Sequence, residues 1–135
     1  MKAKLDHVAL AVRSIEETTA VYEQLGLEAA ETCTMEESGL RIGFLSAGGS
    51  QLELLEPLRP DTTVARFLER RGEGLHHICF EVDDIRAALA ELSARGVELI
   101  DREPRPGAEG LTAFLHPRAG KGVLIELVQK DHPAS

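Results

Sequence analysis

The chain has 135 residues, and its 43% hydrophobic and 28% charged side chains are typical of a folded globular protein of one domain. The net charge of −8 disfavours nucleic acids and anionic membranes as partners, because both are bound through positive charge. No stretch approaches the roughly 18 consecutive apolar residues of a membrane-spanning helix, and the first residues lack the apolar core of a secretory signal. With two isolated cysteines, Cys33 and Cys79, these features predict a cytoplasmic protein.

The sequence repeats itself after 70 positions. Residues 5–12 fall on residues 75–82, and the match continues through a helical segment and further strands. The matched positions include the pairs His7/His77 and Phe44/Phe114 and, after three additional residues in the second half, Glu53/Glu126. An ordered match of this kind predicts two structurally similar modules.

The first copy begins with a predicted strand and helix. Bulky side chains alternate with small or polar ones over residues 7–12, so one face of the strand is apolar and the other is not. Ser14 and Glu17 have the spacing of a capping box, and Gly26 provides the end of the helix. Turn residues at positions 37–39 and 47–50 then separate further strands.

A short helix over about residues 61–72 links this copy to the second one. The second copy again predicts a strand, then a helix capped by Asp84 and closed by Gly96, then strands between turns over residues 104–110 and 117–122. The fold class expected from this order is α+β, with two tandem βαβββ modules forming a curved mixed sheet around a cleft. We expect a single domain, residues 1–135, divided as module 1 (about residues 4–58), the linking helix and module 2 (about residues 74–130).

Each module carries a His in its first strand and a Glu in its last strand, on the face opposite the bulky row. If the modules pack about a pseudo-twofold axis, the side chains of His7, Glu53, His77 and Glu126 converge in one cleft. Two imidazoles and two carboxylates suit a divalent ion such as Co²⁺, Mn²⁺, Ni²⁺ or Zn²⁺. An octahedral ion would keep two open positions, where it could polarise a substrate carbonyl.

The alternative interpretation is structural. A single strand His is more often a surface residue or a satisfied core residue, and a single strand Glu can lie on an exposed face. Here both residue types are duplicated in register, and a carboxylate buried among apolar neighbours costs several kcal/mol without a partner or ion. The duplication therefore favours a metal site.

Several segments resemble a known family. They are residues 53–57, 72–78, 82–85, 103–108, 114–117 and 122–127. Together with the two His and two Glu, they resemble the vicinal oxygen chelate superfamily, which includes glyoxalase I and extradiol dioxygenases, and within it the methylmalonyl-CoA epimerase family. The resemblance extends over about residues 5–129. It implies a glyoxalase/bleomycin-resistance-like fold, a homodimer, an acyl-CoA substrate and a metal ion, Co²⁺ first among those above, bound by His7, Glu53, His77 and Glu126.

The implied activity is an isomerase reaction, the interconversion of (R)- and (S)-methylmalonyl-CoA. The proton at C2 is weakly acidic, so a divalent ion that stabilises the enediolate would allow its removal. Inversion requires return of the proton from the other face, and therefore two acid/base groups. We expect Glu126 to be one of them, and Glu53 or a metal-bound water to be the other. Some family members have a glutamate base at the position of Ile42, where this chain has no carboxylate.

Other polar residues are weaker candidates. His116 could contact substrate or act as a turn residue before Pro117, and Lys121 could contact the CoA moiety. The same holds for the loop arginines Arg102, Arg105 and Arg118, for which solvated loop charge is the alternative. His76 should point away from His77 and pack against the protein, and His132 is assigned no role.

Three other functions are compatible with parts of the pattern. A glyoxalase I-type lactoylglutathione lyase would use the same four ligands. A dioxygenase needs two His and one carboxylate, so the fourth ligand argues against it. A metal-free drug-binding protein of this superfamily would have no need for two His and two Glu in register.

Overall fold

The computed structural model describes residues 1–131; residues 132–135, among them His132, lie outside the described part. The described chain forms nine strands and three helices: β1 (Lys4–Ala11), α1 (Ile15–Glu23), β2 (Glu28–Ala29), β3 (Cys33–Met35), β4 (Leu40–Ala47), β5 (Ser50–Pro57), α2 (Thr63–Arg71), β6 (Gly74–Glu81), α3 (Ile85–Ala94), β7 (Arg105–Pro106), β8 (Gly110–Leu115) and β9 (Leu124–Lys130). No helix within residues 1–131 has both the length and the apolar character needed to cross a bilayer.

The chain divides into two compact units. We call residues 7–76 the first unit, and residues 77–131 together with residues 1–6 the second unit. Strand β1 begins in the second unit and continues into the first.

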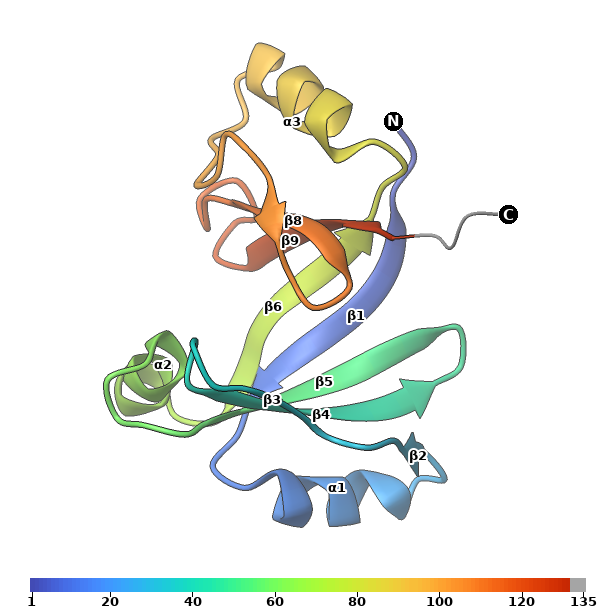
Figure 1. Ribbon diagram of the computed structural model, residues 1–135, viewed down its shortest axis with the longest axis vertical. Helices are drawn as coiled ribbons and strands as arrows, with labels where there is room; N and C mark the ends of the chain where they lie inside the picture. Colours follow the sequence, from blue (N-terminus) through green and yellow to red (C-terminus); the bar gives the residue numbers. More distant parts are fainter. Residues whose placement is uncertain (132–135) are drawn as a thin grey trace. The chain divides into compact units, whose positions relative to one another are not determined.

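The first unit is a mixed sheet with helices on its faces. Strand β5 pairs in parallel with β1 and antiparallel with β4, and both β2 and β3 pair with β4. Figure 1 shows α1 lying against β4 and β5. Under α1, Ile15 packs with Val12, Leu45 and Leu54. This is the bulky face that the alternation in the sequence predicted.

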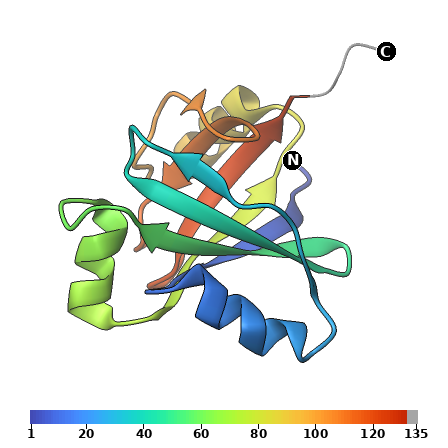
Figure 2. The same ribbon diagram turned by 60° about the horizontal axis from the view of Figure 1, so that its bottom comes forward.

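The opposite face of the first unit has smaller side chains and is covered by α2. Ala9, Ala11 and Leu55 form a cluster with Val64 and Leu68 of this helix. Figure 2 shows α2 close to the end of β5, from which the chain reaches it through a short turn. The helix ends at Gly72, whose φ of 75° lies in the left-handed region that glycine adopts without strain. The predicted linking helix is therefore present as residues 63–71.

The second unit repeats this arrangement. Strand β9 pairs in parallel with β6 and antiparallel with β8, and β7 pairs with β8. Helix α3, capped by Asp84 as predicted, packs Ile85, Ala88 and Leu89 on the bulky face of β8 and β9. The predicted α+β class with two βαβββ modules is confirmed.

One detail differs from the sequence-based expectation. The strand predicted after the first helix is divided into β2 and β3, which pair with different parts of β4. Exposed residues 30–32 separate the two strands. In the second unit the corresponding region contributes β7 and a single bridge between Leu99 and Leu115.

The last strand of each unit caps the helix that follows the first strand. The Ile15 N–H donates to Glu56 Oε2 over 2.7 Å, and the Ile85 N–H donates to Gln129 Oε1 over 2.9 Å. These donors belong to the first helical residue and have no partner within the helix. Glu56 and Gln129 stand three positions after Glu53 and Glu126, so the cap links each helix to the strand that carries the glutamate.

Arg41 reinforces the cap of the first unit. Its Nη1 lies 3.7 Å from Glu56 Oε2, and its Nη2 lies 2.6 Å from Glu16 Oε2. The Arg41 guanidinium lowers the pKa of Glu16, and the Glu16 carboxylate in turn raises the pKa of Arg41. Both charged groups lie at the surface, where solvent screens their interaction.

We expect Glu56→Ala to lower the free energy of unfolding by about 1 kcal/mol, because the Ile15 N–H loses its acceptor. Glu56→Gln should cost less, since Gln129 caps Ile85 with an amide oxygen. Urea unfolding of both variants measures the difference. Equal losses in the two variants would assign the effect to the charge beside Arg41 and not to the hydrogen bond.

Candidate active site

The first unit contains a buried imidazole–carboxylate pair. His7 on β1 and Glu53 on β5 lie on parallel neighbours, with Ala9 directly opposite Glu53. His7 Nδ1 is 3.1 Å from Glu53 Oε2, and the two side chains are only 7% and 10% exposed. Leu52 and Leu54 face the other side of the sheet, toward α1. The alternation that places leucines in the core therefore directs Glu53 to the opposite face.

The second unit contains the same pair in the same register. His77 on β6 and Glu126 on β9 lie on parallel neighbours, with Cys79 directly opposite Glu126. His77 Nε2 is 3.2 Å from Glu126 Oε1, and the side chains are 8% and 14% exposed. In both units, the residue that faces the Glu stands two positions after the His. The sequence repeat thus corresponds to a repeated three-dimensional arrangement.

Burial makes these pairs chemically informative. A desolvated carboxylate costs several kcal/mol unless a positive charge, hydrogen-bond donors or a metal ion compensates. Imidazole nitrogens and carboxylate oxygens are also ligands of divalent transition-metal ions. Each unit therefore contributes one nitrogen and one carboxylate donor of the kinds that such an ion binds.

A phenylalanine accompanies each glutamate, a role that our sequence analysis missed. Phe44 on β4 lies opposite Glu53, and Phe114 on β8 lies opposite Glu126. The Phe114 ring also packs on His77 with a centroid distance of 5.8 Å and an interplanar angle of 89°. The signal was present in the repeat, where Phe44 and Phe114 coincide.

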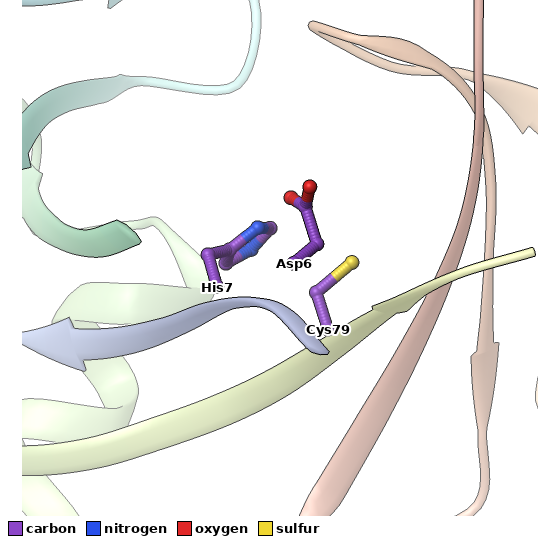
Figure 3. A group of neighbouring side chains, drawn as sticks. All are labelled: Asp6, His7 and Cys79. Carbon is purple, nitrogen blue, oxygen red and sulfur yellow. The ribbon is translucent and has the colours of Figure 1, made fainter. Parts of the chain in front are cut away.

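Asp6 and Cys79 lie next to each other in the second unit. Figure 3 shows their side chains on β1 and β6, together with His7, the next residue of β1. A carboxylate oxygen of Asp6 and the Cys79 sulfur lie within 4.8 Å of each other. Asp6 also forms an ion pair with Lys130 Nζ, although its own side chain is only 7% exposed. The start of β1 is therefore anchored to the end of β9.

The loop after β8 holds the two residues expected to contact substrate. His116 Nδ1 accepts a hydrogen bond from the Arg118 N–H over 3.1 Å, and its Nε2 lies 3.4 Å from Glu98 Oε2. His116 therefore stabilises the turn that follows it. Lys121 is exposed and has a φ of 57°, a left-handed conformation that is uncommon outside glycine.

Arg118 and Arg105 are paired with carboxylates of the second unit. Arg118 Nη2 lies 3.0 Å from Glu98 Oε2, and Arg105 Nη2 lies 3.5 Å from Asp101 Oδ2. Arg102 is exposed.

Ile42 and His76 have apolar surroundings in the first unit. Ile42 on β4 lies opposite Leu55 and belongs to the buried cluster with Ala9 and Leu55. Strand β4 carries no acidic residue, so this strand supplies no base. The His76 ring packs on Phe67 of α2 at a centroid distance of 4.9 Å, which is the packing role expected for it.

Comparison with known proteins identifies relatives along nearly the whole chain. The family model of the Glyoxalase/Bleomycin resistance protein/Dioxygenase superfamily matches residues 6–115. Protein YqjC of Bacillus subtilis is 45% identical over 128 residues, which cover 93% of this chain and 91% of that protein. Human mitochondrial methylmalonyl-CoA epimerase is 40% identical over 129 residues, which cover 93% of this chain and 73% of the human protein.

A solved structure gives the same result. A methylmalonyl-CoA epimerase in complex with methylmalonyl-CoA and NH₄⁺ superposes with a TM-score of 0.84 at 37% identity, and 94% of each chain is covered. The resemblance and the glyoxalase/bleomycin-resistance-like fold expected from the sequence are confirmed.

The ion pair at the start of β1 predicts a pH dependence of stability. Hydrogen bonding to Asp6 raises the pKa of Lys130, with Glu109 and Glu81 adding to the effect. A raised pKa means that the contribution is complete below the unfolded value of about 10.4 and is lost as the pH rises through the folded value. We expect Lys130→Gln to lower the urea midpoint at pH 8, and the difference from the parent protein to shrink as the pH rises through the raised pKa of Lys130. A difference that stays constant to pH 12 would contradict a charge-based contribution.

Proposed function

We propose that this chain, which belongs to the Glyoxalase/Bleomycin resistance protein/Dioxygenase superfamily and within it to the methylmalonyl-CoA epimerase family, interconverts (R)- and (S)-methylmalonyl-CoA. The observation that carries the proposal is the buried His–Glu pair found twice in the same register. Inversion at a single carbon needs acid/base groups on two opposite sides. The duplicated module supplies two equivalent carboxylates, Glu53 and Glu126.

We propose that His7, Glu53, His77 and Glu126 together bind one divalent ion. The donor set supports this, since it consists of two imidazoles and two carboxylates, all almost completely buried. Co²⁺ is our first candidate, with Mn²⁺, Ni²⁺ and Zn²⁺ as the other ions that this donor set accepts. When bound, such an ion supplies an electrophile for the thioester oxygen and so stabilises the negative charge left by removal of the C2 proton.

The chain itself moves the proton. We assign Glu126 as the group that removes or returns the C2 proton on one side, and Glu53 as its counterpart on the other. Strand β4 offers no alternative to Glu53, because it has no acidic residue and its Ile42 lies in an apolar cluster. Burial of both carboxylates keeps bulk water away from the carbanionic carbon.

Substrate contacts outside the reacting centre fall to the loop after β8. We propose that Lys121 binds an anionic group of the CoA moiety, and that His116 holds this loop in place or contacts the acyl group. The exposed side chain of Lys121 and the hydrogen bond from the Arg118 N–H to His116 support this assignment.

The reaction is tested by proton NMR of methylmalonyl-CoA in D₂O. Protein loaded with Co²⁺ should remove the C2 proton signal of both epimers, and a sample treated with EDTA should not. Glu53→Gln should slow exchange from one epimer by at least about 100-fold, in line with the loss of one acid/base group. Undiminished exchange from both epimers would exclude Glu53. No exchange in fully loaded protein would contradict the epimerase assignment and direct the assay to the methylglyoxal hemithioacetal of glutathione.

The metal site is tested by neighbouring histidines. His77→Asn should weaken Co²⁺ binding by at least about 10-fold, measured by calorimetry. His76→Asn is the matched control, because His76 packs on Phe67 and should leave Co²⁺ affinity unchanged. Equal affinities of the two variants would argue against ligation by His77.

The homodimer and the cytoplasmic location expected from the sequence stay predictions. Light scattering of the purified protein and fractionation of the host cell measure them directly.

A further inference from the structure

Phe114 is held by the segment that precedes β7. The carbonyl oxygen of Phe114 accepts from the N–H groups of Ile100 and Asp101, over 3.0 and 3.1 Å. The N–H of Phe114 donates in turn to Asp101 Oδ2 over 2.8 Å. Asp101 therefore binds both polar groups of the Phe114 backbone, and a carboxylate is a strong acceptor for this purpose.

Arg105 adds a contact to the ring of the same residue. Its guanidinium carbon lies 6.0 Å from the centroid of the Phe114 ring, and its Nη2 lies 3.5 Å from Asp101 Oδ2. Arg105 stands on β7 opposite Thr112, which shares a strand face with Phe114. Asp101 thus fixes the backbone of Phe114, and Arg105 lies over its ring.

Phe114 contacts the His77–Glu126 pair on its other side. Its ring is perpendicular to the His77 ring, and its backbone lies directly opposite Glu126 on β9. A perpendicular aromatic pair has a preferred geometry, so a fixed Phe114 restricts the orientation of the imidazole. One residue therefore separates Asp101 and Arg105 from His77.

The first unit lacks this carboxylate contact. The Phe44 carbonyl accepts from the Ala30 N–H, as the Phe114 carbonyl accepts from the Ile100 N–H. The position that corresponds to Asp101 in the repeat is Glu31, which is exposed. The carboxylate contact at Asp101 is therefore a particular feature of the second unit and is not required by the fold of the module.

We propose that Asp101 and Arg105 are positioning residues for His77, acting through Phe114. They fix the Phe114 ring, against which the His77 imidazole packs. The imidazole is therefore held in one orientation, with its Nε2 toward Glu126. The role in metal binding rests on the proposed function, whereas the effect on the orientation of the His77 ring does not.

The first test uses metal-free protein with ¹³C-labelled histidine. Asp101→Ala should shift and broaden the ring resonances of His77, which are assigned with His77→Asn. Asp101→Asn keeps an oxygen acceptor for the Phe114 N–H and should retain the parent spectrum more closely. Glu31→Ala is the matched control and should leave the His77 resonances unchanged. Unchanged His77 resonances in Asp101→Ala would overturn the proposal.

A double-mutant cycle separates positioning from a general loss of stability. Phe114→Leu removes the ring, so Asp101→Ala in that background should produce no further change at His77. A second shift of the same size in the Phe114→Leu background would show that Asp101 acts by another route. Arg105→Met should change the His77 resonances less than Asp101→Ala, because the backbone hydrogen bond is retained.

Co²⁺ titration then tests whether Asp101 affects metal binding. We expect Asp101→Ala to weaken Co²⁺ affinity by about 10-fold and to alter the visible spectrum of the bound ion, with partial rescue in Asp101→Asn. If the parent protein binds no Co²⁺, the proposed function fails while the resonance test still decides the positioning role. If Co²⁺ binds and Asp101→Ala retains full affinity and spectrum, the role of Asp101 in metal binding is excluded.

Discussion

The parallel pairing of the first and last strands of each unit is the constraint on which the site depends. It brings together a His and a Glu that are far apart in the sequence, and it does so in one register at β1–β5 and at β6–β9. A shift of one residue would turn Glu53 or Glu126 to the face packed against α1 or α3 and bring a leucine or isoleucine to the face that carries the His. The apolar core therefore enforces the register, and the site follows from it.

The caps on the helices protect this register. Glu56 and Gln129 connect the end of β5 or β9 to the first turn of α1 or α3, three residues beyond each glutamate. Each strand that carries a buried glutamate is thus hydrogen-bonded to the helix of its own unit. That the two units use different side chains for the same bond indicates that the position of the acceptor matters more than its charge.

Much of the fold could be predicted from the sequence, because alternation and repetition are local properties. The strand faces, the caps at Ser14 and Asp84, the stop at Gly72 and the repeat of His and Glu could all be inferred from spacing. The roles of Phe114 and Asp101 could not, since Asp101 stands in a loop whose path no periodic pattern describes. The ion pair between Asp6 and Lys130 could not be predicted either, because charged residues are common near strand ends and nothing in the sequence pairs these two.

The two units have diverged around a common arrangement, and the differences bear on how the carboxylates divide their work. In the first unit, Glu53 lies opposite Ala9 of β1 and Phe44 of β4, and Ala9 belongs to the apolar cluster of Ile42. In the second unit, Glu126 faces Cys79 and is flanked by Phe114, which Asp101 holds. A glutamate that stays bound to an ion is a weaker base, because the cation stabilises its charged form. In the proposed site, Glu53 would therefore have to leave the ion in order to accept a proton, or water would carry out the transfer on its side.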